Sequence, residues 1–427
     1  MSLDKDLSKL LDAGVISEET AEKIQTFYLE KKGDSSGRMF LVFGILGALL
    51  AGLGIILIIA HNWDDLSRSA KTGLSFLPLV LGQITCLFAL LKRNSSSTWR
   101  EGSSTFLFFA VGASISLISQ IYHIQGDFDS FMFIWMLLCL PAIYLMRSSM
   151  TSLLYLIGIT TFAVSAGYES NTMDPYFYCL LFLATLPHYY LLYKKNPTGN
   201  FLILHHWLLP LSVIICLGTI HYDLGEYLII AYTSLFGFYF LIGQLDFFKN
   251  QILRNNSYLV FGAIGTIFMM LLMSFGDMWN GIYENIDLIT SVTKAPEFYG
   301  ALLLTGASAF LLMRFFKQNK IESILPLGIV FIVFVVLFMV GIWLPIGALV
   351  INLVILTIGI WIVKTGANQS HLGQLNFGLL TVAILIACRF FDTDLSYVMR
   401  GVLFLIVGVG FFGANYWMLK KRKADEK

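Results

Sequence analysis

The chain alternates long apolar runs with short polar segments along almost its whole length. An apolar run of about 20 residues is long enough to cross a bilayer as one α-helix. Arg147 alone separates the fourth and fifth runs, and residues 341–345 separate the eleventh and twelfth. We therefore expect an all-α, polytopic integral membrane protein. The pattern predicts fourteen transmembrane helices, at approximately 39–60, 72–91, 104–122, 130–146, 149–167, 176–193, 200–219, 227–245, 257–275, 298–315, 321–342, 344–363, 371–388 and 396–418.

A polar segment precedes the first apolar run. Within residues 4–32, apolar positions recur at helical spacing in two groups, which predicts two short helices. Ala13-Gly14 interrupts the first helix, and Ser17 is expected to cap the second. We interpret this segment as a short cytoplasmic helical hairpin. It rests on the membrane face, pairs with a second copy in a homo-oligomer, or contacts a cytoplasmic partner.

Composition supports a membrane protein and excludes most other classes. Hydrophobic residues make up 57% of the 427 residues and charged residues only 13%, whereas soluble chains carry about 25% charged residues. A soluble enzyme, a disordered chain and a disulfide scaffold are therefore excluded. The net charge of +1 indicates no nucleic-acid partner. All five cysteines lie in apolar runs and none has C-x-x-C spacing, so the cysteines indicate no metal site, and we expect no cofactor. The histidines and aspartates at two outer helix ends leave metal binding open.

The distribution of basic residues predicts the orientation. With the N-terminus inside, fourteen spans assign 23 of the 28 Lys and Arg residues to the cytoplasmic face. Such a bias follows the positive-inside rule. We therefore expect both termini in the cytoplasm.

Loop length suggests how the chain is organised. The longest loop on the outer side is acidic, and it separates nine predicted helices from five. The expected regions are a hairpin and linker at 1–37, an N-terminal membrane domain of helices 1–5 at 38–167, middle helices 6–9 at 168–275, the outer acidic loop at 276–297, and C-terminal helices 10–14 with a basic tail at 298–427.

Two predicted helices end on the outer face with similar polar side chains. Each end offers a histidine, an amide, an aromatic ring and carboxylates. If the first four helices pack as a bundle, these groups converge in one outward-facing pocket, where they bind a ligand; the alternative is that they anchor a solvated rim. The candidate residues are His61, Asn62, Trp63, Asp64 and Asp65 at the first end, and His123, Gln125 and Asp127 at the second.

A second group of candidates lies near the C-terminus. Arg389 and Arg400 are on the outer side against the positive-inside tendency, with Asp392 between them. One interpretation is an internal salt bridge that locks the last pair of helices. The other is a cationic site for a phosphate or carboxylate headgroup, because arginine binds both groups in a bidentate manner.

Three segments resemble a known family. These are the apolar run with its polar end at 54–64, the corresponding run at 112–124, and the hairpin sequence at 10–16. Over about residues 5–160 the chain resembles the bacterial multi-pass membrane family catalogued as domain of unknown function 2157. The resemblance implies a bacterial protein of the plasma (inner) membrane and supplies no activity.

Three functions remain open. We favour a protein that binds or moves a small molecule or lipid through an outward-facing polar pocket. The alternatives are a membrane enzyme acting on a lipid-linked substrate at the outer face, and a scaffold or sensor that signals through the N-terminal hairpin. No Asp, Glu or Lys lies in the middle of a predicted span. This argues against simple proton coupling, because coupled carriers commonly keep a carboxylate there. No catalytic residue is identified, and enzymatic activity stays undecided.

Overall fold

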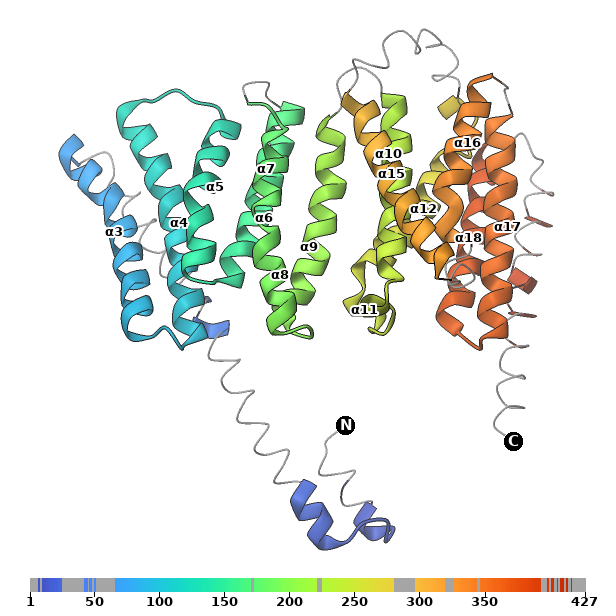
Figure 1. The fold of residues 1–427 in the computed structure, drawn as a ribbon, viewed down its shortest axis with the longest axis horizontal. Coiled ribbons are helices and arrows are strands. Elements are labelled where there is room, and N and C mark those ends of the chain that lie inside the picture. The colour runs from blue at the N-terminus through green and yellow to red at the C-terminus, as the bar shows by residue number, and fades with distance from the viewer. Residues whose placement is uncertain are drawn as a thin grey trace. The chain divides into compact units, whose positions relative to one another are not determined.

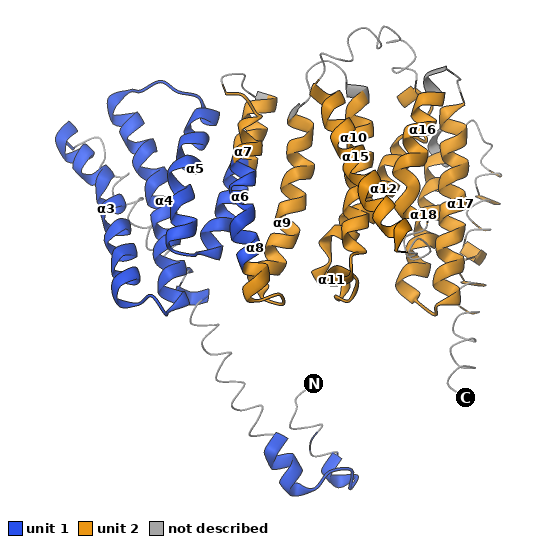
Figure 2. Cartoon of the chain, viewed as in Figure 1, with its two compact units in different colours: residues 1–159, 181–191 blue, residues 160–180, 192–427 orange. Residues whose placement is uncertain are grey.

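The structure is a computed structural model. It describes residues 7, 10–24, 42–44, 46–47, 50, 66–169, 173–220, 225–279, 296–318, 326–343, 346–392, 398, 401–402, 405, 408–410, 412–413 and 416. These residues form helices and turns, with no strand among them (Figure 1). The chain divides into two compact units (Figure 2): residues 1–159 with 181–191, and residues 160–180 with 192–427.

The first unit is built from antiparallel helices that follow one another in the chain. They are α3 (Arg68–Lys92), α4 (Ser97–Tyr122), α5 (Phe128–Leu145), most of α6 (Ser149–Val164), and the segment in which α7 (Phe177–Leu183) gives way to α8 (Leu186–Lys195). Arg147 adopts a left-handed conformation with φ 49° between α5 and α6. The fourth and fifth predicted spans are therefore two separate helices, as expected.

The second unit packs its helices around a large apolar core that includes Tyr239, Phe331, Phe334, Phe338 and Ile351. Its helices are α9 (Asn200–Leu217), α10 (Gly225–Gly243), α11 (Asp246–Lys249), α12 (Ser257–Leu272), α15 (Pro296–Lys317), α16 (Val330–Trp343), α17 (Gly347–Asn368) and α18 (Leu372–Asp392). Short turns of other helix types also belong to it: η1 (Ser165–Glu169), η2 (Gly218–Ile220), η3 (Leu253–Asn255) and η6 (Leu327–Ile329).

The helices bear out a multi-pass membrane protein. Eight described helices are long and apolar enough to cross a membrane, and three shorter apolar helices accompany them, at Tyr227–Gly243, Ser257–Leu272 and Leu327–Val340. The separate helices α16 and α17 agree with the predicted division at 341–345. Most of the predicted first and last spans lies outside the described residues. The number fourteen and the orientation of the termini therefore stay predictions.

One predicted span is corrected by the structure. The pattern predicts a single helix over 176–193, but the chain turns at Ala184 and Thr185 and forms α7 and α8 instead. Pro187 explains the interruption, because proline has no backbone N–H to bond the carbonyl four residues earlier. Helical hydrogen bonding cannot run unbroken through this point.

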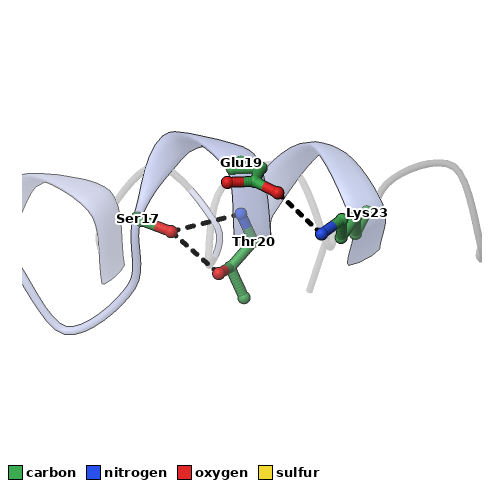
Figure 3. A network of polar contacts seen from close by, with 4 residues as sticks. All are labelled: Ser17, Glu19, Thr20 and Lys23. Atoms are coloured by element: carbon green, nitrogen blue, oxygen red, sulfur yellow. Dashed lines mark hydrogen bonds and ion pairs between the residues drawn. The ribbon is translucent and has the colours of Figure 1, made fainter.

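The described part of the N-terminal hairpin agrees with its sequence signals. Gly14 has φ +67° and ends the first helical segment. The Ser17 hydroxyl accepts a hydrogen bond from the Thr20 backbone N–H at 3.3 Å, which caps the second segment (Figure 3). Lys23 forms an exposed ion pair with Glu19 at 2.7 Å. Such surface pairs contribute little to stability, so the cap is the main local determinant of this turn.

Candidate functional site

A polar group in the second unit surrounds Arg389, which lies in the last turn of α18. Its Nη2 donates a hydrogen bond to the Ser274 hydroxyl oxygen at 3.2 Å. Its guanidinium carbon lies 4.7 Å from the centroid of the Phe275 ring. Ser274 and Phe275 follow Met273, which caps the end of α12, so the end of that helix meets the end of α18 at this point. Cation–π contact and a hydroxyl acceptor both stabilise the positive charge here.

The Ser274 hydroxyl has a defined donor direction. It donates its only proton to the Leu271 carbonyl at 2.6 Å, one turn back in α12. A hydroxyl has one donor and two acceptor positions. Its lone pairs are therefore available to the Arg389 guanidinium, and no base is activating this serine as a nucleophile. The serine positions the arginine.

Asn352, in the second turn of α17, connects a third helix to the same serine. Its Nδ2 donates to the Ser274 carbonyl at 2.9 Å and to the Ala348 carbonyl at 2.7 Å. Its Oδ1 is buried and has no hydrogen-bond partner in the structure. The ends of α12 and α18 and the beginning of α17 thus converge on Ser274.

Trp279 fixes where α17 begins. Its ring is 2% exposed, and its Nε1 donates to the Met273 carbonyl at 2.8 Å. A Cβ added at Gly347, the first residue of α17, would lie 2.7 Å from the Trp279 ring. Only glycine leaves room for this approach. Because Asn352 is five residues further along α17, the tryptophan contact also sets the position of the asparagine.

The arrangement suits recognition of an anionic group. Arginine presents a planar fork of N–H donors that matches carboxylate and phosphate oxygens. Arg389 is partly exposed, and it contacts a hydroxyl and an aromatic ring. The predicted partner Asp392 ends α18, but its side chain and Arg400 lie outside what the structure describes. Of the second candidate group, only Arg389 can be placed in a site.

The outer-end candidates of the first unit form an exposed turn. Tyr122 ends α4, where its hydroxyl lies 3.2 Å from the Thr72 hydroxyl of α3 and its ring lies 5.9 Å from the Arg68 guanidinium carbon. His123 follows in a left-handed conformation. His123, Gln125 and Asp127 are all exposed. The other candidates of this group, His61, Asn62, Trp63, Asp64 and Asp65, lie outside the described residues.

No group of three or more His, Cys, Asp or Glu side chains that could hold a metal occurs among the described residues. All five cysteines are free thiols.

Two residues of this site, Asn352 and Ser274, are not recognisable as site residues from the sequence. The pattern marks Asn352 as an uncharged polar residue in an apolar run, a type that most often joins neighbouring helices. Nothing in the sequence connects Asn352 with Ser274, which lies 78 residues earlier. A useful signal would have been that an arginine, a serine and an amide all fall near the predicted outer ends of apolar runs.

Comparison with known proteins identifies one family. Residues 8–152 match the model of DUF2157, described as a predicted membrane protein. This match confirms the resemblance inferred from the hairpin and the two apolar runs. No curated protein and no solved structure matches the chain. Arg389, Ser274 and Asn352 lie outside the matched segment.

Proposed function

We propose that this multi-pass membrane protein binds, and moves across or along the bilayer, an amphiphile with an anionic headgroup. The observation that carries the proposal is the contact of Arg389 with Ser274 and Phe275, at the meeting point of three apolar helices. A basic residue at such a place is expensive, and it is commonly kept because a substrate or ion uses it. The headgroup supplies phosphate or carboxylate oxygens to the guanidinium.

Apolar surface beside the site favours a lipid over a soluble anion. Leu349 and Leu353, on either side of Asn352 in α17, have exposed fractions of 64% and 56%. In a helix of this hydropathy, such side chains face acyl chains. A headgroup at Arg389 would then continue into tails that lie along α17.

Binding is a better match for this site than chemistry on the ligand. The Ser274 proton is committed to a backbone carbonyl, and an amide and an aromatic ring lie beside the serine and the arginine. These groups orient a headgroup without transferring a proton or forming a bond. The charge distribution along the chain favours the outer leaflet of a bacterial plasma membrane as the side from which the lipid enters.

The test is native mass spectrometry of the full chain in mild detergent with equal amounts of phosphatidylglycerol and phosphatidylcholine. We expect the wild type to retain phosphatidylglycerol preferentially, and Arg389→Gln to lose that preference. Lys364→Gln is the matched control, because it removes a positive charge from an exposed position of α17 and should leave the preference unchanged. Equal retention of both lipids by the wild type would overturn the proposal.

Arg389→Lys separates the headgroup site from a structural salt bridge. Lysine keeps the charge but loses the bidentate fork, so lipid preference should fall between those of the wild type and Arg389→Gln. If Arg389 serves only to lock the last helices, Arg389→Gln lowers the melting temperature and lipid retention stays that of the wild type. That combination would support the salt bridge against the lipid site.

A further inference from the structure

We infer that the headgroup recognised at Arg389 is a phosphodiester that also carries a hydroxyl group, with Asn352 accepting the hydrogen bond from that hydroxyl. The inference rests on the proposed function and names the substrate class of the same site. It depends on the buried amide oxygen of Asn352, which the anionic part of a headgroup cannot satisfy.

The orientation of the Asn352 amide is set by its neighbours. Two carbonyl oxygens, of Ser274 and Ala348, lie 2.9 and 2.7 Å from its nitrogen. The opposite orientation would place the amide oxygen against two carbonyl oxygens. The nitrogen therefore faces the carbonyls, and Oδ1 is left buried without a donor. Buried acceptors are nearly always paired, and each exception calls for an explanation.

Arg389 and Asn352 bond different oxygen atoms of one residue. The guanidinium bonds the Ser274 hydroxyl, and the amide bonds the Ser274 carbonyl. Because both side chains bond the same serine, we take a single headgroup to contact both. One part of that headgroup must accept hydrogen bonds from arginine, and the other must donate one to Asn352 Oδ1.

Hydroxylated phosphodiesters meet both requirements. A phosphodiester at neutral pH is an anion that only accepts hydrogen bonds, so the donor must come from the attached alcohol. A glycerol or sugar headgroup supplies it. Because the amide oxygen is covered by protein atoms, the hydroxyl reaches it through a local movement of side chains.

The experiment compares two lipids of the same charge. Phosphatidylglycerol and phosphatidylmethanol are both monovalent phosphodiesters, and only the first has headgroup hydroxyls. Both are offered at equal concentration to the wild-type protein in mild detergent, and the retained lipids are counted by native mass spectrometry. We expect the wild type to retain several-fold more phosphatidylglycerol. Equal retention of the two lipids would overturn this inference and leave the anionic-lipid proposal standing.

Two variants test whether Asn352 causes the preference for phosphatidylglycerol over phosphatidylmethanol. Asn352→Leu should bring the ratio of the two lipids close to one, while total anionic lipid stays bound through Arg389. Asn376→Leu, an exposed position in α18, is the matched control and should keep the wild-type ratio. If Asn352→Leu folds and retains the preference, Asn352 is not the acceptor and the inference fails. If the wild type retains neither lipid, the proposed function itself fails.

A soluble competitor decides whether the acyl chains matter. Glycerophosphoglycerol carries the same phosphodiester and hydroxyls but no tails. At millimolar concentration it should leave phosphatidylglycerol in place, because the lipid also contacts α17 through its chains. Displacement of the lipid would identify a soluble phosphate ester as the ligand and overturn the assignment to a lipid headgroup.

Discussion

Glu101 accepts a hydrogen bond from the Ser148 hydroxyl at 2.6 Å, across 47 residues of chain. The same carboxylate accepts from the backbone N–H groups of Ser149 at 3.0 Å and Met150 at 2.9 Å. These are the first N–H groups of α6, which have no partner within the helix. A carboxylate also complements the positive end of the helix dipole. Glu101 therefore fastens α4 to the beginning of α6.

Replacing Glu101 with alanine should destabilise the first unit strongly. Three donors, two of them buried and one partly buried, would lose their acceptor, and we expect the free energy of unfolding to fall by about 3 kcal/mol. Glu101→Gln keeps one carbonyl oxygen and should lose less. Unfolding in a denaturing detergent measures both. Glu18→Ala, at an exposed position of the hairpin, should change nothing, and an equal loss in both alanine variants would contradict the capping role.

Gly112 should not tolerate alanine. An added Cβ would lie 2.5 Å from the Trp135 ring, and that ring is held by its Nε1 hydrogen bond to the Phe108 carbonyl at 2.8 Å. Overpacking of this kind costs about 1–3 kcal/mol. Gly102→Ala in the same helix meets no atom within 4 Å and is the control. Thermal melting should show a lower midpoint for Gly112→Ala only. Equal melting temperatures of the two variants would contradict this prediction and show that the Trp135 ring moves aside without cost.

Local signals in the sequence predict much of the helical architecture. Arg147 is a single charged residue between two apolar runs, and it does mark the turn between α5 and α6, because a charge has no place within a lipid-facing helix. Ser17 is a good cap and caps its helix. Hydropathy, however, is averaged over a window of residues. The apolar run over 176–193 therefore predicts one continuous helix and does not reveal the interruption at Pro187.

Long-range pairing is what the sequence cannot supply. Glu101 follows a polar turn and has the composition of a solvated helix start, yet it is only 4% exposed, because Ser148 lies against it. Asn352 and Arg389 meet at Ser274 only through the packing of α12, α17 and α18. The sequence alone identifies Arg389 as a candidate, because its positive charge on the outer side conflicts with the positive-inside rule. The uncharged residues at this site produce no such conflict.

The Tyr144 hydroxyl bonds the turn between α7 and α8, and we expect it to contribute to the stability of the protein. It donates a hydrogen bond to the Ala184 carbonyl, which the turn removes from regular helical bonding. Tyr144→Phe leaves this carbonyl without its donor in an apolar setting, at a cost of about 1–3 kcal/mol. Tyr416→Phe, where the side chain is 71% exposed, is the control. Unfolding in denaturing detergent should separate the two variants, and identical curves would show that the carbonyl finds another donor.

The orientation of the helices in the membrane can be tested at two exposed turns of the first unit. Ser95 lies between α3 and α4, and Gly126 lies between α4 and α5; both are exposed, and α4 separates them. The positive-inside rule predicts that Ser95 faces the cytoplasm and Gly126 the outside. We replace the five cysteines with alanine, introduce Ser95→Cys or Gly126→Cys, and add a membrane-impermeant maleimide to bacterial spheroplasts. Labelling should occur at position 126 at once and at position 95 only after lysis. The reverse order would contradict the predicted orientation of the first unit.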